Sequence, residues 1–459
     1  MEIKVISKES IKPSEPTPEH HKTFKLSSFD LLHRNTYFPL ILFYPQIPNP
    51  NTNVASQLKK SLSEILTIFY PLAGRRNDAV SVSCNDEGAP FLEATANASI
   101  SEFLNPPRLE SLNRLLPIEP YRLLIEEGGS EGEVATSSSS SLPNVAVQVT
   151  RFSCGGVAIG VCNLHTVMDA CSCGVMMKAW SAICREEREE MAWPDFENAF
   201  ALFPPRDFSG MRAGLLGSKI ELETNCRIQR FVFSHEAMNN LKSEAKDEDD
   251  PTSPTPTRYQ ALSCFLTKHM ILSNPTPTRT ATTVIFHIVD VRRRMGPPLS
   301  HTSMGNLLWP TLIPYPHASI TPHTTLKHLL PIMTRAIGRI NKDLFVRMKE
   351  DPDFLASDLC GELLLEGMEE SEGVVSFVFT SWSNLGFKDL DFGWGKPLWV
   401  GFRGGRAQNA VPNTVVFVDT EEGIEAWVSM DEERLAVLEN DADFLRFALL
   451  NPSVQVSCT

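Results

Sequence analysis

The sequence lacks any long apolar run. The longest runs, near 37–44 and 155–162, are far shorter than the roughly 20 residues that span a bilayer. The first 22 residues are too polar for a signal peptide. Basic residues are also in the minority, since 42 Lys and Arg against 56 Asp and Glu give 42 − 56 = −14. Nucleic acids and anionic lipids attract basic surfaces, so we expect no nucleic acid, no membrane and a soluble, cytoplasmic chain.

Motifs for metals and phosphates are missing as well. The ten cysteines are scattered in mostly apolar contexts, which favours reduced, buried thiols. Cys171 and Cys173 would face different sides of a predicted helix, and no second ligand cluster accompanies them, so no metal site is expected. No glycine-rich loop ends in Lys-Ser or Lys-Thr. The G-x-S-x-G string at 128–132 lies in an acidic, serine-rich segment and is interpreted as a chance match.

At 459 residues the chain exceeds the usual size of one domain. A Pro- and Gly-rich segment without periodicity predicts a linker at 201–225 between domains 1–200 and 226–459. Strand and helix patterns alternate irregularly in both halves, which predicts an α/β fold with mixed sheets flanked by helices. The interface between two domains is a favoured place for a ligand.

Local patterns predict individual elements and two mobile loops. The expected strands cover 37–44, 145–152, 157–165, 280–292 and 374–382, and the expected helices cover 56–75, a stretch from 169 onward and 432–450. The expected loops cover 126–143 and 243–258, which are acidic or rich in Ser and Pro.

The string NLHTVMDA at 163–170 places a histidine where a strand ends and a helix begins. His165 and Asp169 are either a base with its support or two structural residues, a hydrogen-bonded histidine and a helix cap. With eleven histidines and Asp at about 5% of positions, roughly half such a match is expected by chance. The spacing alone therefore leaves both interpretations open.

A second unusual string is LDFGWGKP at 390–397. Two glycines around a tryptophan predict a tight backbone path beside a large buried ring. We interpret this string as a structural turn.

Taken together, these strings resemble the BAHD family of plant acyl-CoA-dependent acyltransferases, and the branch that contains vinorine synthase in particular. The matching segments, in the order of the family, are YPLAGR (70–75), His165 to Asp169, VDVRRRMGPPLS (289–300), MGN (304–306), TSW (380–382) and Asp391 to Gly395. The resemblance covers nearly the whole chain.

The resemblance implies two chloramphenicol-acetyltransferase-like domains with a solvent channel between them, and a segment near 371–395 is a candidate to pack with the N-terminal domain. Acyl-CoA would enter at one mouth of the channel and a small-molecule alcohol at the other. A ternary complex would form without an acyl-enzyme. No cofactor is implied beyond acetyl-CoA as co-substrate, and the family default is a monomer.

The resemblance also assigns roles to residues. His165 would act as general base, and an imidazole with a pKa of about 6.5 is mostly neutral at cytosolic pH. Asp169 would turn away from the channel and pair with Arg292. Trp382 is the candidate donor to the oxyanion, and Thr380 and Ser381 would line the channel. The residues expected to be structural are Arg292, Asp391, Gly393, Trp394 and Gly395.

Departures from the family pattern narrow the substrates. Ala170 replaces a frequent glycine, and only small size is required there. Met304 replaces the Phe of the Tyr-Phe-Gly-Asn string found in malonyl-transferring members, which favours acetyl-CoA as donor. We expect a triterpenoid acceptor such as a limonoid rather than an indole alkaloid. A non-catalytic binding relative and a thioester hydrolase remain the alternatives.

Overall fold

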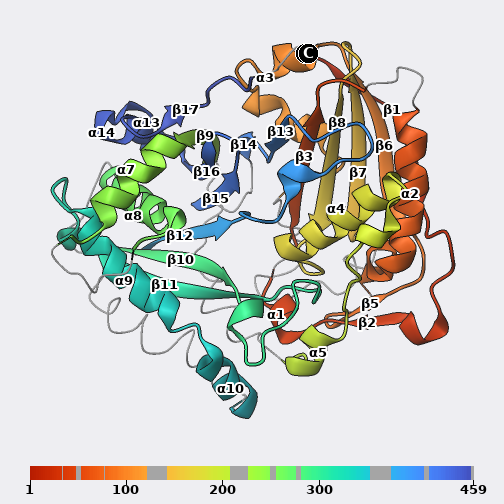
Figure 1. The fold of residues 1–459 in the computed structure, drawn as a ribbon, viewed down its shortest axis with the longest axis horizontal. Coiled ribbons are helices and arrows are strands. Elements are labelled where there is room, and N and C mark those ends of the chain that lie inside the picture. Colours follow the sequence, from red (N-terminus) through yellow and green to blue (C-terminus); the bar gives the residue numbers. More distant parts are fainter. Residues whose placement is uncertain are drawn as a thin grey trace, which may run out of the picture.

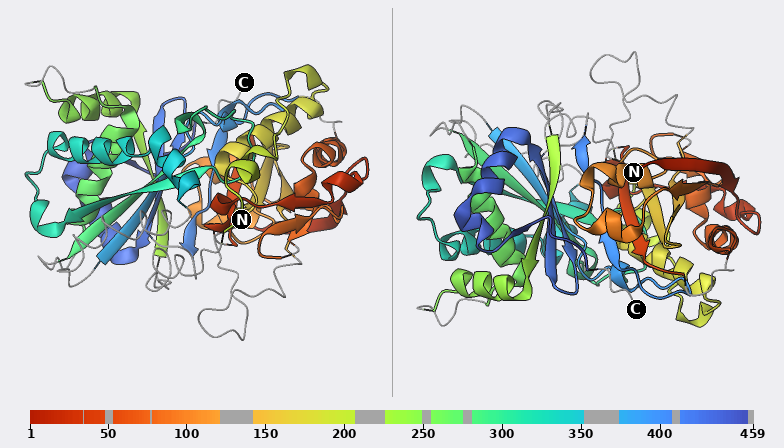
Figure 2. Two further views of the ribbon diagram at one scale, coloured as in Figure 1. Left: turned by 90° about the horizontal axis from the view of Figure 1, so that it is seen from below. Right: turned by 90° about the horizontal axis from the view of Figure 1, so that it is seen from above.

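Two large β-sheets lie side by side, one formed mainly by the N-terminal half and one by the C-terminal half (Figures 1 and 2). The computed structural model describes residues 1–33, 35–47, 53–76, 78–120, 142–206, 226–248, 255–274, 281–351, 374–407 and 413–455. The prediction of an α/β fold with mixed sheets flanked by helices is confirmed. The predicted loop 126–143 and the predicted linker 201–225 lie largely outside the described residues. The predicted loop 243–258 is too long at both ends, because Ser243 to Ala245 belong to helix α7 (His235–Ala245) and Arg258 begins helix α8 (Arg258–Leu272).

The first sheet has six strands in the order β1-β6-β7-β8-β3-β13. Their bounds are β1 (Ile3–Ile11), β6 (Ala89–Ala96), β7 (Val145–Phe152), β8 (Val157–Leu164), β3 (Tyr37–Tyr44) and β13 (Trp399–Gly401). The β6–β7 pair is parallel and the other pairs are antiparallel. Strands β3 and β8 are buried along their whole length, which explains why both are continuous apolar runs.

The second sheet has eight strands, of which β17 pairs with β9 off the main path. The main order is β11 (Leu308–Pro316), β10 (Thr282–Asp290), β12 (Val374–Ser381), β15 (Thr414–Asp419), β16 (Gly423–Asp431), β9 (Cys226–Ser234) and β14 (Gly405–Ala407), and β17 covers Leu449–Leu450. The pairs β10–β12 and β12–β15 are parallel. A small third sheet contains β2 (Thr23–Lys25), β5 (Ser81–Ser83) and β4 (Arg75–Arg76).

Helices flank both large sheets (Figure 1). Beside the first sheet, α2 (Val54–Ile68) and α4 (Ala170–Cys184) pack together, and the Trp180 indole N–H donates to Ser61 Oγ at 3.0 Å. Helices α7 (His235–Ala245), α8 (Arg258–Leu272) and α9 (Leu326–Gly338) pack against one another beside the second. The others are α1 (Ser28–Leu31), α3 (Ile100–Leu104), α5 (Asn198–Leu202), α10 (Lys342–Glu350), α13 (Glu432–Asn440) and α14 (Ala442–Leu445).

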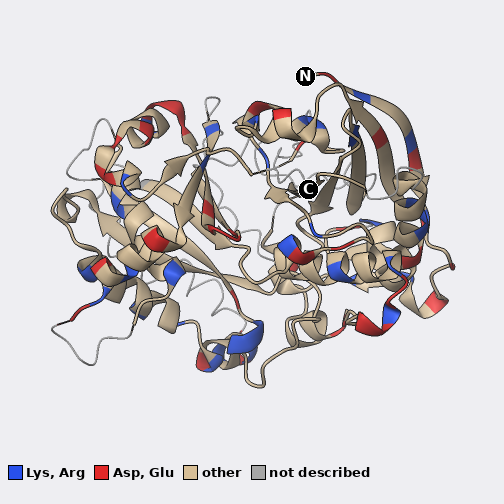
Figure 3. Cartoon of the chain, turned by 45° about the horizontal axis from the view of Figure 1, so that its top comes forward, with Lys and Arg blue, Asp and Glu red and all other residues tan. Residues whose placement is uncertain are grey.

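The outer elements of both halves carry acidic and basic residues interspersed with one another (Figure 3). Short 3-10 helices occur at Glu19–His21, Tyr70–Ala73, Leu109–Leu115, Arg188–Glu190, Arg292–Arg294, His317–Ser319 and Phe387–Asp389. Within the described ranges, no helix has the length and apolar character needed to cross a membrane.

Most predicted elements are present, with two differences at helix ends. The predicted helix 56–75 ends as an α-helix at Ile68, before a 3-10 turn. The prediction of one helix over 432–450 is wrong. Asp441 ends α13 and begins α14 because its carboxylate accepts hydrogen bonds from two backbone N–H groups of the next turn, and Leu449–Leu450 pair with β9 instead.

The boundary between domains 1–200 and 226–459 stays a prediction. One strand from beyond this boundary lies in the first sheet. Strand β13 pairs with β3, and its Trp399 lies at the contact with the second sheet. The fully buried Glu425 of β16 accepts the Trp399 indole N–H at 3.0 Å, the Trp427 indole N–H at 3.1 Å and an Arg230 N–H at 2.6 Å. One carboxylate therefore bonds to both sheets.

We expect Glu425→Gln to lower the free energy of unfolding by about 3–5 kcal/mol, because Arg230 would stay buried without its counter-ion. The matched control is Asp389→Asn, which breaks the exposed pair with Lys396 and should leave the free energy of unfolding nearly unchanged, because water screens the two charges. Denaturant unfolding measures both. Equal losses in the two variants would show that the buried Arg230–Glu425 pair adds no more stability than an exposed pair.

Candidate active site

His165 stands at the end of a central, buried strand. Strand β8 lies between β7 and β3, and its last residue, Leu164, precedes the histidine. The His165 backbone N–H donates to the Thr36 carbonyl oxygen at 2.8 Å, so the strand pairing extends to the histidine itself. The side chain is half-buried. A rigid strand therefore fixes the backbone from which the imidazole projects.

Two aromatic rings contact the imidazole. His33 stacks on His165 with ring centroids 4.5 Å apart and an interplanar angle of 7°. Phe38 of β3 contacts the imidazole edge-on at 5.1 Å and in turn contacts Trp382 at 6.1 Å. Burial lowers the pKa of His165 below its ordinary 6.5, and this effect outweighs the opposing contributions of the residue's own backbone, Asp169 and Asn306. The imidazole is therefore neutral at neutral pH.

Asp169 points away from the imidazole and forms a buried ion pair. Its Oδ2 lies 2.8 Å from Nη1 of Arg292, and its Oδ1 lies 3.2 Å from Nη2. The same carboxylate caps α4 by accepting the Ser172 N–H at 2.8 Å and accepts the Leu307 N–H at 3.1 Å. The predicted pairing of Asp169 with Arg292 is confirmed.

The Arg292 guanidinium has partners on all three of its nitrogens. Besides Asp169, it donates to the carbonyl oxygens of Ser303 at 3.0 Å and Gly305 at 3.1 Å, and to Ser172 Oγ at 3.2 Å. Burial alone would lower the pKa of Arg292, but nearby negative groups, Asp169 foremost, raise it above its ordinary value. The arginine therefore stays charged and holds the turn before β11 against the first turn of α4.

A cavity of about 420 Å³ opens beside that first turn. Ala170 and Cys171 of α4 form one wall, and residues of β10, β12 and α8 form others. Thr380 and Ser381 line the cavity, as does His287, whose pKa burial lowers to about 4. His165 and Trp382 are not among the lining residues.

Trp382 follows strand β12 and is nearly buried. Its ring packs against Phe387 at 5.6 Å and Phe402 at 4.9 Å, in addition to the Phe38 contact that connects it to His165. The assignment of its indole N–H to the oxyanion stays a prediction, as do the channel roles of Thr380 and Ser381.

The LDFGWGKP string forms a tight turn away from the histidine. Asp391 Oδ1 accepts the backbone N–H groups of Gly393 at 2.7 Å and Gly395 at 2.9 Å. Both glycines have positive φ, +104° and +94°, a backbone conformation that other residues adopt only with strain. Trp394 is buried against Tyr44 of β3 at 5.9 Å. This geometry fits the structural interpretation of Asp391, Gly393, Trp394 and Gly395, whose roles no measurement yet tests.

Sequence reasoning missed two residues of the site, Asp30 and Asn306. Asn306 contacts the His165 imidazole, and Asp30 contacts Asn306. The string MGN at 304–306 matches the family without indicating a role for Asn306. The Ser27-x-x-Asp30 spacing is typical of a capping box and indicates the start of a helix, but no contact with the histidine. Across the part of the chain that the structure describes, no group of three or more His, Cys, Asp or Glu residues is arranged to hold a metal ion.

Comparison with known proteins identifies the family. A sequence model described as "Transferase family" matches residues 1–445. This chain is a BAHD acyltransferase. Stemmadenine O-acetyltransferase of Catharanthus roseus is 33% identical over 96% of this chain and 97% of its own. Limonoid 7-O-acetyltransferase of Citrus sinensis is 32% identical over 98% and 99% of the two chains.

A solved structure supports the same assignment. The crystal structure of vinorine synthase superposes on this BAHD acyltransferase with a TM-score of 0.78 and 31% sequence identity, over 99% of this chain and all of the other. The expected family and fold are therefore confirmed. The chain is an acyl-CoA-dependent acyltransferase.

We expect Asp169→Ala to lower both stability and activity, because Arg292 would remain buried without its main counter-ion. The expected loss of unfolding free energy is about 3–5 kcal/mol. Asp290→Ala is the matched control, since Asp290 contacts the same guanidinium at 3.3 Å but is 44% exposed, and its loss should cost about 0–1 kcal/mol. Thermal or denaturant unfolding measures both variants. An Asp169→Ala protein as stable as the wild type yet inactive would establish a direct chemical role for Asp169.

We expect the acidic limb of kcat/KM against pH to have its midpoint below 6.5. A general base must be unprotonated, and burial lowers the pKa of His165, so activity is lost only as the pH falls through that lowered pKa. The measurement is initial rate against pH at low acceptor concentration. A midpoint above 6.5 would contradict the prediction and would indicate that a carboxylate stabilises the imidazolium directly.

Proposed function

We propose that this acyltransferase is an acetyl-CoA-dependent O-acetyltransferase that acts on a hydroxyl group of a polycyclic plant alcohol, a triterpenoid of the limonoid type. The observation that carries the proposal is the state of His165. Its Nδ1 is engaged by Asn306 Oδ1 at 3.0 Å, and burial keeps the ring neutral, so Nε2 is left as a free base. The proposal includes a monomeric, cytoplasmic enzyme.

The chemistry follows from that free base. Nε2 of His165 takes the hydroxyl proton while the acceptor oxygen attacks the thioester carbonyl carbon, and general-base help of this kind is worth roughly 10²–10⁴-fold. The tetrahedral intermediate then collapses, the C–S bond breaks, and the imidazolium returns the proton to the thiolate. The products are an ester and free CoA. We assign the stabilisation of the oxyanion to the Trp382 indole N–H.

The cavity beside α4 fits the donor side of this reaction. It is lined by Ala170 and Cys171 at the start of α4 and by Thr380 and Ser381 of β12, which offer hydroxyl groups. We assign these two residues to the path of the acyl-CoA.

Two observations support a neutral polycyclic acceptor. Limonoid 7-O-acetyltransferase is a relative over nearly the full chain. The rings that contact His165 belong to His33 and Phe38, which offer flat surfaces and no carboxylate. An indole alkaloid alcohol is the second candidate because stemmadenine O-acetyltransferase is equally similar. A protonated alkaloid amine would favour a nearby carboxylate, and Asp30 already holds four hydrogen bonds.

Mass spectrometry of the purified protein tests the proposal. Wild type, His165→Ala and the control His323→Ala, which alters an exposed histidine, are each incubated with acetyl-, malonyl- and coumaroyl-CoA and pools of limonoid, other terpenoid and alkaloid alcohols. We expect an acetyl mass gain on a limonoid-type alcohol with wild type and His323→Ala, and a loss of about 10²–10⁴-fold in His165→Ala.

Three other outcomes would contradict the proposal. A product formed only from an alkaloid alcohol would show that the acceptor is an alkaloid and not a limonoid-type triterpenoid. Release of CoA at the full rate without any acceptor would indicate a thioester hydrolase. Acyl-CoA that stays intact in the presence of every acceptor would indicate a binding protein.

A further inference from the structure

The contacts of Asn306 fix which way its amide points. The Asn306 Nδ2 atom lies 2.7 Å from the carbonyl oxygen of His165 and 2.9 Å from Asp30 Oδ1. A carbonyl oxygen and a carboxylate oxygen only accept hydrogen bonds, so this side of the amide must be the NH₂ group. The other side, Oδ1, then faces His165 Nδ1 at 3.0 Å. An amide oxygen only accepts, so Nδ1 must carry the hydrogen.

Asp30 is an acceptor in this arrangement because four donors surround it. Its Oδ1 accepts the Asn306 backbone N–H at 2.7 Å and the Asn306 amide, and its Oδ2 accepts the Ser27 backbone N–H at 2.7 Å and hydroxyl at 2.6 Å. Burial raises the pKa of Asp30, and these hydrogen bonds oppose that rise. Each oxygen faces a backbone N–H, which can only donate, so the ionised carboxylate suits this position.

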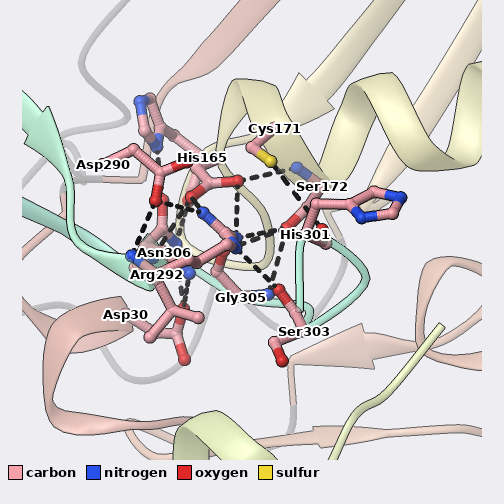
Figure 4. Close-up of polar contacts among 12 residues, drawn as sticks. Asp30, His165, Cys171, Ser172, Asp290, Arg292, His301, Ser303, Gly305 and Asn306 are labelled. Atoms are coloured by element: carbon pink, nitrogen blue, oxygen red, sulfur yellow. Dashed lines mark hydrogen bonds and ion pairs between the residues drawn. The ribbon is translucent and has the colours of Figure 1, made fainter. Parts of the chain in front are cut away.

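The backbone segments that carry these residues are buried too. Ser27 and Asp30 form a capping box that starts α1, and both are buried. Asn306 is fully buried and precedes Leu307, whose N–H bonds to Asp169. Figure 4 shows the side chains of Asp30, Asn306 and His165 lying close together. Three segments that are distant in the sequence thus meet at one side of the imidazole.

We infer that Asp30 and Asn306 are positioning residues that hold His165 in its Nδ1–H tautomer. Without such a partner the proton of a neutral imidazole can occupy either nitrogen, and with Nε2 protonated the base would be on the wrong atom. The tautomer follows from the contacts of Asn306 alone. Its role in acetyl transfer rests on the proposed function. Asp169 does not hold the tautomer, since Arg292, Ser172 and Leu307 occupy its carboxylate.

The intervening amide also suits the charge that His165 must carry during the reaction. A carboxylate bonded directly to Nδ1 would favour the protonated ring and raise the pKa of His165. Here the neutral amide of Asn306 separates the ring from Asp30, so the free base is retained. When Nε2 accepts the proton of the acceptor hydroxyl, Nδ1–H stays hydrogen-bonded to Asn306. The negative charge of Asp30, on the other side of the amide, then stabilises the imidazolium. The Nε2 proton then passes to the CoA thiolate.

The test is the tautomer of His165 read by ¹⁵N NMR of protein labelled at the histidine imidazoles, without substrate. The His165→Ala spectrum assigns the signal, and His269, whose Nδ1 lies 2.6 Å from Asp441, is the internal reference. We expect the Nδ1–H pattern in wild type and a shift toward Nε2–H in Asn306→Ala. The matched control is Asn163→Ala, which removes another fully buried amide whose contact is to Cys173 Sγ at 3.4 Å and should leave the tautomer unchanged.

Kinetics separate positioning from a structural role. We expect Asn306→Ala to lower kcat about 10- to 100-fold with the KM for acetyl-CoA unchanged. Asp30→Asn keeps the shape and an amide oxygen for Asn306, so it should retain the Nδ1–H tautomer and lose less kcat than Asn306→Ala. If Asn306→Ala does not fold, the wild-type spectrum still tests the inference, because an Nε2–H pattern there would overturn it.

Two results would overturn the inference: an Nε2–H tautomer in wild type, or an unchanged tautomer in folded Asn306→Ala. The proposed function fails separately. An Nδ1–H tautomer that depends on Asn306, in a protein that acetylates no alcohol, would support the positioning contacts and remove the acetyltransferase. Acetyl transfer by a protein with an Nε2–H tautomer would support the acetyltransferase and overturn the inference on Asp30 and Asn306.

Discussion

The buried ion pair between Asp169 and Arg292 is the interaction on which the site depends. Removing two charges from water is costly, and a buried pair repays that cost only when its remaining donors and acceptors are satisfied. Here the arginine reaches the carbonyl oxygens of Ser303 and Gly305, and the carboxylate accepts the N–H groups of Ser172 and Leu307. The pair therefore ties the first turn of α4, in one half of the chain, to the turn that precedes β11 in the other.

This tie extends to the imidazole through the backbone. Leu307 bonds to Asp169 and follows Asn306, whose amide bonds to the His165 ring. The aspartate four residues after the histidine thus supports it indirectly, by fixing the segment that carries the orienting amide. The carboxylates of Asp169 and Asp30 bond to Arg292 and Asn306, and not to the imidazole nitrogens. Burial can then lower the pKa of His165 and leave a neutral base.

The sequence predicted the parts of this arrangement that have a local pattern. The apolar runs at 37–44 and 157–164 became the buried strands β3 and β8, and the change to helical spacing after Asp169 became α4. The pairing of Asp169 with Arg292 came from family resemblance. Asp30 and Asn306 could not be predicted, because each is an ordinary polar residue in its own segment and they meet across 276 positions of sequence. Only the folded chain brings such residues together.

The same long-range contacts bear on how substrates enter. Two buried charged groups join elements of the two sheets, the Asp169–Arg292 pair and Glu425 with Arg230 and Trp399. The Arg230–Glu425 pair lies within the second sheet, so separating the sheets would break the Asp169–Arg292 pair and the Trp399–Glu425 hydrogen bond. We therefore expect substrates to bind between halves that stay together. Acceptor choice must then reside in side chains along the path to His165.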